Sequence, residues 1–303
     1  MWPPNPKTMK FDKIGNYYQI CDVDVSEEEI LFISDIEDFV PRANNMLMEQ
    51  IINDKKRVVV FIGDILSFLE IDEGYFKIYK YASFAWDLLV NEQELIEKNI
   101  ISEENLDDPH FKKKYMAFII SKRILENEAD AISNFCRFIE QCKKLNVKVI
   151  YYSGNHDSML SPKNANPHSN ELEACEVIKM IYSLENLFIF PNMARIKMND
   201  NLFLMGVHTS NNTYTCNEYP SLHEYINELD KINKPENIIF LSHVPGVEKY
   251  SKIGSKDITN LKKRYKFKSH YHGHCKDYHG TYIECGVKTR SVHACHTKLF
   301  NLD

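Results

Sequence analysis

Five polar side chains that suit metal binding each come directly after a short apolar run. They are Asp35, Asp64, Asn155, His243 and His274. Apolar runs of this kind are typical of β-strands that are covered on both faces, and sites in open α/β sheets gather at the carboxyl ends of the strands. We therefore expect these five side chains to lie together. Their carboxylate, amide and imidazole groups suit Mn, Fe, Zn or Mg.

The motifs around these residues resemble those of the calcineurin-like metallophosphoesterases, over roughly residues 30 to 300. That family shows D-x-H, then G-D, G-N-H-D/E, a lone H and G-H-x-H. The corresponding residues here are Asp35-Ile36-Glu37, Gly63-Asp64, Gly154-Asn155-His156-Asp157, His243 and Gly273-His274-Cys275-Lys276. The Gly-Asn-His-Asp motif after an apolar strand is the most specific of these matches.

The resemblance implies two metal positions. The residues of one position are all present, namely Asp64, Asn155, His243 and His274. The other position would use Asp35, the shared Asp64 and two histidines. Glu37 and Lys276 stand where those two histidines would be.

The resemblance also implies a catalytic role for the Gly-Asn-His-Asp motif. In the family, a hydroxide between the two ions attacks phosphorus in line, and the histidine of this motif protonates the leaving group. The residue in that position here is His156, and Asp157 is expected to orient it.

The two departures from the pattern affect the same metal position. Glu37 can still bind a metal through oxygen, but a protonated Lys276 has no lone pair and repels a divalent cation. Positions 274 and 276 face the same side of an extended segment, so we expect Lys276 to enter the pocket and to attract Asp35 and Glu37. Two unit charges ~4 Å apart attract by about 4 kcal/mol at an effective dielectric of ~20. One bound ion is therefore expected rather than two.

Two other arrangements of this segment remain open. A bulge could turn Cys275 or Asp277 toward the metal and restore the second ion. Alternatively, Lys276 could point to solvent and leave the position vacant. If Lys276 enters the pocket, its charge could stabilise the phosphorane oxygens in place of the missing cation.

Strand and helix signals alternate along the chain and place the motifs on a β-α-β framework. Strands are predicted at 30–33, 58–62, 147–152, 187–190, 194–198, 202–207, 237–241, 265–271 and 281–285, with a small hairpin around 14–17. A helix is predicted at 41–54, where Pro41 suits the first turn. A second helix, with apolar residues on one face, precedes residue 147.

Residues 67–130 separate two motif-bearing strands and are too many for a plain crossover. Apolar and aromatic side chains from Tyr75 to Leu89 recur at helical spacing, and 116–125 is also helix-like. We predict a helical insertion within a single domain that spans 1–303. Its aromatic residues are expected to pack onto the core, with a lid or a protein-binding surface as the alternative.

The composition is that of a globular protein. Apolar residues make up 44% of the 303 residues and charged residues 26%. The net charge of −6 argues against general nucleic-acid binding. Eight basic residues lie in 249–268, where we expect a solvated face, with a patch for phosphate or nucleic acid as the alternative. No apolar run reaches the ~18 residues that a membrane-spanning helix needs.

The eight cysteines form no C-x-x-C pair, and residues 1–6 lack the pattern of a signal peptide. We therefore expect reduced thiols and a cytoplasmic location. His293, Cys295 and His296 fit no common structural zinc spacing, so no zinc site is expected there. His208 is expected to be structural and is a spare candidate for the lone histidine.

These features predict an α/β fold, the four-layer sandwich of metallophosphoesterases, with two mixed sheets flanked by helices. The predicted function is hydrolysis of a phosphomonoester or phosphodiester by a metal-bound hydroxide. The alternative is a non-catalytic scaffold or protein-binding module, because the family includes a retromer subunit and accessory subunits of replicative DNA polymerases. The intact Gly-Asn-His-Asp motif favours catalysis, whereas the changes at 37 and 276 favour the scaffold. The sequence does not fix the substrate.

Overall fold

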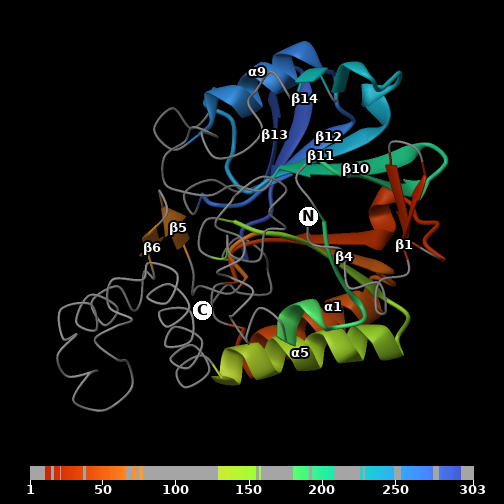
Figure 1. Ribbon diagram of the computed structural model, residues 1–303, viewed down its shortest axis with the longest axis vertical. Coiled ribbons are helices and arrows are strands. Elements are labelled where there is room, and N and C mark those ends of the chain that lie inside the picture. The colour runs from red at the N-terminus through yellow and green to blue at the C-terminus, as the bar shows by residue number, and fades with distance from the viewer. Residues whose placement is uncertain are drawn as a thin grey trace, which may run out of the picture.

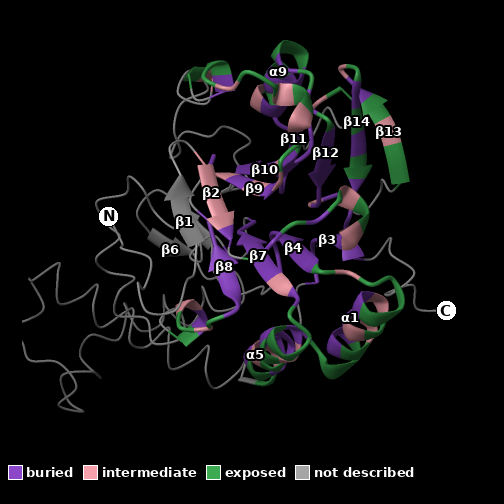
Figure 2. Ribbon diagram, turned by 90° about the vertical axis from the view of Figure 1, so that its right-hand side faces the viewer, coloured by how far each residue is buried: buried purple, intermediate pink, exposed green. Residues whose placement is uncertain are grey.

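Two stacked β-sheets with helices on both outer faces make up most of the described part of the chain, which also holds one separate two-stranded sheet (Figure 1). In this computed structural model the described residues are 11–14, 17–20, 22–36, 39–65, 70–72, 75–77, 129–154, 157, 180–190, 193–207, 226–227, 229–248, 254–275 and 280–294. Helix α9 (Lys256–Arg264) covers the larger sheet, and α1 (Pro41–Asn53) and α5 (Ala129–Lys144) cover the smaller one (Figure 2). This is the four-layer α/β arrangement that the sequence predicts.

The smaller sheet has four strands and is parallel in all its described pairs. Its order is β3 (Ile30–Ile33), β4 (Val58–Ile62), β7 (Lys148–Tyr152) and β8 (Leu187–Ile189). Nearly all residues of these strands are buried, because layers cover both faces of the sheet. The strands therefore appear in the sequence as unbroken apolar runs. The prediction of two mixed sheets is wrong for this sheet, since no antiparallel strand joins its described part.

Within the described residues, the larger sheet has eight strands and is mixed. Its order is β1 (Phe11–Ile14), β2 (Tyr17–Ile20), β9 (Arg195–Asn199), β10 (Leu202–Val207), β11 (Ile238–Ser242), β12 (Ser269–His272), β14 (Val287–Ser291) and β13 (Gly280–Glu284). From β10 to β14 the neighbouring strands in this order are parallel. The carboxyl ends of β11, β12 and β14 therefore lie at one edge.

Local signals explain where the helices begin. Helix α1 begins at Pro41, whose fixed φ suits a first helical position, and it buries Leu47 against the sheet. Helix α9 begins after Ser255, whose hydroxyl oxygen accepts a hydrogen bond from the Ile258 N–H at 3.4 Å. Two short 3₁₀ turns, η1 (Glu27–Glu29) and η4 (Pro235–Asn237), lead directly into β3 and β11.

Three apolar clusters fill the spaces between the layers. The first joins α1 and α5 to the smaller sheet and includes Phe39 and Phe61, whose rings meet edge to face at 6.3 Å. The second lies between the two sheets, where Phe32 stacks on Tyr271 with ring centroids 4.0 Å apart. The third lies under α9 and includes Ile258. Because the second cluster packs the sheets against each other, the ends of their strands stand in a fixed relation.

Most of the predicted strands are confirmed, and so is the N-terminal hairpin of β1 and β2. The predicted strand at 265–271 begins too early, because α9 runs to Arg264 and β12 begins at Ser269. The sequence analysis does not predict β14. Polar residues alternate with buried ones in its sequence Val-Lys-Thr-Arg-Ser, so it lacks the apolar run by which the other strands are found.

The predicted helical insertion is described only in part. Strands β5 (Glu70–Asp72) and β6 (Tyr75–Lys77) form an antiparallel pair, so the helical spacing does not hold at Tyr75. Residues 78–128 lie outside the described residues, and a helical insertion there stays a prediction. In the described ranges, no helix is both long and apolar enough to cross a membrane. No disulfide links the described cysteines Cys136, Cys142, Cys275 and Cys285.

Candidate metal centre

Strands from both sheets end at the same place. Asp35 and Asp64 follow β3 and β4 of the smaller sheet, and His243 and His274 follow β11 and β12 of the larger sheet. Backbone hydrogen bonds hold the two ends within each sheet together. In the smaller sheet the Asp35 N–H donates to the Gly63 carbonyl at 3.0 Å, and in the larger sheet the N–H of residue 273 donates to the His243 carbonyl at 3.0 Å. The structure therefore places these four residues at one edge, whereas Asn155, the fifth residue expected there, lies outside the described residues.

The two sheets are joined at this edge by backbone hydrogen bonds. The Ser34 N–H donates to the Val292 carbonyl at 3.0 Å, and the Ala294 N–H donates to the Ser34 carbonyl at 2.8 Å. Ser34 thus forms a parallel bridge with His293, just beyond β14. This junction holds the end of the larger sheet directly beside Asp35.

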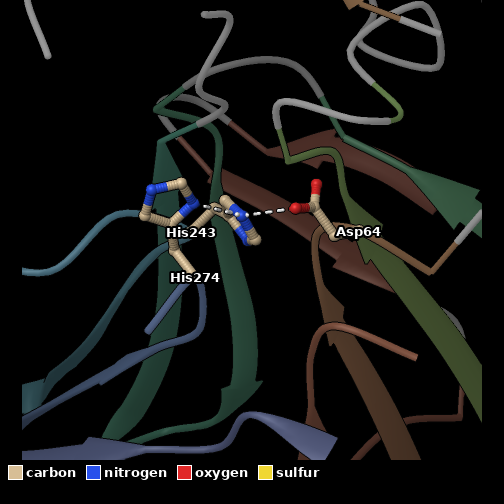
Figure 3. Close-up of side chains that lie close together, drawn as sticks. All are labelled: Asp64, His243 and His274. Atoms are coloured by element: carbon tan, nitrogen blue, oxygen red, sulfur yellow. Dashed lines mark hydrogen bonds and ion pairs between the residues drawn. The ribbon is translucent and has the colours of Figure 1, made fainter. Parts of the chain in front are cut away.

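Asp64, His243 and His274 form a compact group of three ligand residues (Figure 3). Asp64 Oδ2 lies 2.9 Å from His243 Nε2, which lies 3.3 Å from His274 Nδ1. All three ligand atoms lie within 4.8 Å of one another. Asp64 and His243 are buried and His274 is partly exposed, so the group faces solvent on one side. One carboxylate and two imidazoles around one point are a donor set that fits a divalent transition metal.

Glycines allow the ligands to approach this closely. A Cβ on Gly154 would lie 2.2 Å from Asp64 Oδ1, and a Cβ on Gly63 would lie 2.6 Å from His243 Nδ1. Gly63 also has a φ of +83°, which favours glycine. Asp64 itself has a φ of 53°, a left-handed conformation that is uncommon for a residue with a side chain. The glycines of the G-D and G-N-H-D motifs are thus explained by the space around the ligands.

Hydrogen bonds orient the His243 ring. Its Nδ1 lies 2.9 Å from the Ile62 carbonyl oxygen, so we assign the ring proton to Nδ1, which donates to that carbonyl. Nε2 then faces Asp64. Burial on its own lowers the pKa of His243, but the carboxylates of Asp64 and Asp35 outweigh it and raise that pKa to about 10. The same two carboxylates would stabilise a divalent cation.

Asp35 lies beside the three-residue group and has its own set of contacts. Its carboxylate accepts hydrogen bonds from the His274 N–H at 2.9 and 3.1 Å and from the Ser34 hydroxyl. Burial raises the pKa of Asp35 to about 7, and the negative charge of Asp64 acts in the same direction while His243 opposes it. His293 Nε2 lies 3.4 Å from Asp35 Oδ1. The sequence analysis assigns no site to His293; the structure places it here.

Asp157 is fully buried behind the site. Its carboxylate accepts hydrogen bonds from the backbone N–H of Ile65, at 3.0 Å, and of Gly154, and from the Tyr151 hydroxyl. Burial raises the pKa of Asp157 to about 6, and the charge of Asp64 adds to this effect. Asp157 thus fastens the turn after β7 to the turn after β4.

A family model described as calcineurin-like phosphoesterase matches residues 29–275, a span that includes the ends of β3, β4, β7, β11 and β12. The chain belongs to the calcineurin-like phosphoesterase family. Sixteen chains of solved structures also match this one. Among them is a crystal structure with 13% identity and a TM-score of 0.49, over 86% of this chain and 88% of the other. A search of the curated proteins finds no match.

Membership of the calcineurin-like phosphoesterase family indicates a hydrolase that uses divalent metals and acts on phosphoesters. Several predicted site residues of this family member lie outside the described residues, namely Glu37, Asn155, His156 and Lys276. Asp277, His208, Cys295 and His296 also lie outside them. Cys275 is described and buried, and its N–H donates to the Gly273 carbonyl at 2.8 Å.

Beside the candidate metal centre lies a buried charged network that the sequence analysis misses. Lys262 is predicted to belong to a solvated face, but it is fully buried. Its ammonium donates to Glu284, to Thr289 Oγ1 at 2.8 Å and to His270 Nδ1 at 3.1 Å. Burial lowers the pKa of Lys262, whereas Glu284 acts in the opposite direction. The helical spacing of Ile258, Leu261 and Lys262 on one face of α9 is the signal that could have found it.

The network continues from His270 to the strand that carries a ligand. Since His270 Nδ1 accepts from Lys262, its Nε2 carries the proton and donates to Ser242 Oγ at 2.8 Å. The Ser242 hydroxyl in turn donates to the Val244 carbonyl at 2.6 Å. Ser242 and Val244 flank His243, so the network fixes the backbone on both sides of this ligand.

Proposed function

We propose that this chain hydrolyses a phosphomonoester or phosphodiester with one divalent ion held by Asp64, His243 and His274. The observation that carries the proposal is that these three residues, from both sheets, present ligand atoms within 4.8 Å of one another. Asn155 is the proposed fourth ligand, because the family resemblance assigns its position. Mn, Fe, Zn and Mg are the candidate ions.

A bound ion would supply Lewis acidity toward a phosphoryl oxygen. It would also lower the pKa of a water molecule bound to it to about 7. The protein contributes ligands that are held in place before the ion arrives. His243 keeps Nε2 toward the ion because its Nδ1–H is bonded to the Ile62 carbonyl. Asp64 is held in its uncommon backbone conformation by the close packing of Gly154 against it. Such fixed ligands need little reorganisation on binding.

The other proposed roles concern proton transfer and charge. His156 is the proposed acid that protonates the leaving oxygen. His156 lies in the sequence between Gly154 and Asp157, and the Asp157 carboxylate accepts hydrogen bonds from the N–H groups of Gly154 and Ile65. These bonds support the proposal that Asp157 positions the Gly-Asn-His-Asp motif. Lys276 is proposed to lie in the pocket and to supply positive charge to the phosphoryl oxygens. We propose that one ion, rather than two, is bound with high affinity.

A phosphorylated substrate is the partner that this chemistry requires. We propose a cytoplasmic location, because the sequence analysis predicts reduced thiols and no disulfide links the described cysteines. The predicted insertion at 67–130 is the proposed surface for a protein partner.

The test is hydrolysis of an aryl phosphodiester and an aryl phosphomonoester by metal-free protein after Mn²⁺, Fe²⁺, Zn²⁺ or Mg²⁺ is added. We expect turnover in the wild type and a loss of about 100-fold or more in Asp64→Asn and in His156→Ala. Lys288→Ala, an exposed change on β14, is the control and should match the wild type. Wild-type turnover no higher than that of Asp64→Asn with every ion contradicts the proposal. If the ion still binds, the non-catalytic scaffold is then the better account.

A further inference from the structure

We infer that His293 is a ligand of a second, weaker cation position beside Asp35. The inference rests on the proposed function, because it adds an ion next to the one held by Asp64, His243 and His274. It concerns a residue outside the motifs from which the site is predicted.

The backbone holds His293 next to Asp35. Ser34 forms a parallel bridge with His293, and hydrogen bonds join Ser34 to the residues on both sides, Val292 and Ala294, at 3.0 and 2.8 Å. Asp35 directly follows Ser34 in the chain. The His293 side chain is only 3% exposed and is directed at the Asp35 carboxylate. This imidazole is thus placed by the junction of the two sheets.

The separation of the two side chains fits a shared cation. His293 Nε2 lies 3.4 Å from Asp35 Oδ1. A charge-assisted hydrogen bond between such atoms is usually about 2.7–2.9 Å long. Nitrogen and oxygen ligands that each bind one metal ion at about 2.1 Å lie at most about 4 Å apart. The observed distance is long for a direct hydrogen bond and short enough for both atoms to bind one ion.

The charges around Asp35 also favour a cation. Asp35 and Asp64 are both buried, and their negative charges repel each other. A cation between Asp35 and His293 would offset this repulsion. The sequence places Glu37 and Lys276 where the motif pattern has histidine, so His293 supplies an imidazole that the motifs lack.

This second position should bind more weakly than the first. The Asp35 oxygens already accept hydrogen bonds from the Ser34 hydroxyl and the His274 N–H. These bonds occupy lone pairs that an ion would otherwise use. Lys276, which is proposed to lie in the pocket, would weaken the position further.

The test is a titration of metal-free protein with Mn²⁺ alone, in which electron paramagnetic resonance measures the free ion. We expect a tight and a weak class of site in the wild type. His293→Gln should keep the tight class and weaken the other by tenfold or more. Ser291→Ala, which removes a polar group two residues earlier on β14, should leave both classes unchanged.

Each failure has a distinct meaning. A wild type with one tight class that His293→Gln does not alter overturns the role of His293 and leaves the proposed function intact. A wild type that binds neither Mn²⁺ here nor Zn²⁺, Fe²⁺ or Mg²⁺ in parallel titrations removes the proposed function and this inference together. Equal loss of both classes in His293→Gln, in a protein that still folds, shows a structural role and also overturns the inference.

A second measurement uses the wild type only and does not depend on how the variant folds. With ¹⁵N-labelled histidine and Zn²⁺, ring nitrogens of His243 and His274 should shift with the first equivalent. The His293 Nε2 signal should shift with the second. A His293 signal that stays unchanged at saturating Zn²⁺ contradicts the inference.

Discussion

His243 Nδ1 lies 2.9 Å from the carbonyl oxygen of Ile62, so a histidine that follows β11 is oriented by the last residue of β4. This contact crosses from the larger sheet to the smaller one. The turn that offers the carbonyl continues through Gly63 to Asp64, whose carboxylate faces the same ring. One turn therefore supplies both the group that fixes the tautomer of His243 and a ligand beside it. The candidate metal centre is built by the contact between the sheets.

Gly63→Ala should destabilise the protein strongly. A Cβ at position 63 would lie 2.4 Å from the Gly154 Cα, and the backbone has a φ of +83°. The left-handed backbone costs about 1–2 kcal/mol for a residue with a side chain, and overpacking adds about 1–3 kcal/mol. Urea unfolding of the metal-free variant should show a combined loss of about 2–5 kcal/mol.

Gly286→Ala is the matched control for this prediction. Gly286 also has a positive φ, +76°, but a Cβ there would meet nothing within 4 Å. We expect it to lose only the backbone contribution of about 1–2 kcal/mol. Equal losses in the two variants would show that the close approach at position 63 has no energetic importance.

Lys262→Met should strongly lower the free energy of unfolding, although methionine is similar to lysine in length and shape. It leaves the buried Glu284 carboxylate without the ammonium that donates to it. Removal of one partner of a buried ion pair typically costs about 3–5 kcal/mol. The double variant Lys262→Met/Glu284→Gln removes both charges and should recover at least half of that loss.

A double-mutant cycle in urea gives the coupling between the two residues. We expect a coupling free energy of about 2 kcal/mol or more. Losses that simply add in the double variant would contradict the view that Lys262 and Glu284 act as a pair.

The contribution of His270 to stability should fall as the pH falls below about 6.5. Burial lowers the pKa of His270 well below its usual range, and the charge of Lys262 on α9 and the nearby His272 ring act in the same direction. Glu284 on β13 faces Lys262, and Ser242 on β11 accepts from the His270 ring. Below pH ~6.5 the unfolded chain therefore binds a proton at His270 that the folded protein does not bind.

The expected slope from this one group is about 1.4 kcal/mol per pH unit. We predict that His270→Gln reduces the pH dependence of unfolding by this amount between pH 6 and pH 5, measured in urea on metal-free protein. The absolute stability of the variant does not affect this test, because only the change in the free energy of unfolding per pH unit is compared. Identical slopes in the wild type and the variant would show that His270 is protonated in the folded protein.

The sequence predicts the ligand-bearing strands because they are buried on both faces. Strand β4 is an unbroken apolar run, and its end marks Asp64. The same reasoning places Asp35 and His243. Parallel strands share one carboxyl edge, so residues far apart in the chain could be expected to meet before their contacts were known.

The residues that the sequence misses lie where this signal is weak. β14 alternates buried and exposed residues at its position near the sheet edge, so nothing marks His293 as following a strand. Lys262 stands among basic residues, and only the geometry of α9 turns it inward while Lys263 stays exposed. The placement of His293 depends on tertiary packing, which composition and short-range pattern do not contain. For Lys262, the helical spacing with Ile258 and Leu261 is the one available signal.

The central claim is that Asp64, His243 and His274 together hold one divalent ion. Calorimetric titration of the metal-free protein with Mn²⁺ and with Zn²⁺ tests it most directly. We predict one tight equivalent in the wild type and in the exposed control Lys288→Ala, with the affinity lowered about 100-fold or more in Asp64→Asn and in His274→Ala. A wild type without tight binding, or tight binding that both ligand variants retain, would contradict the account.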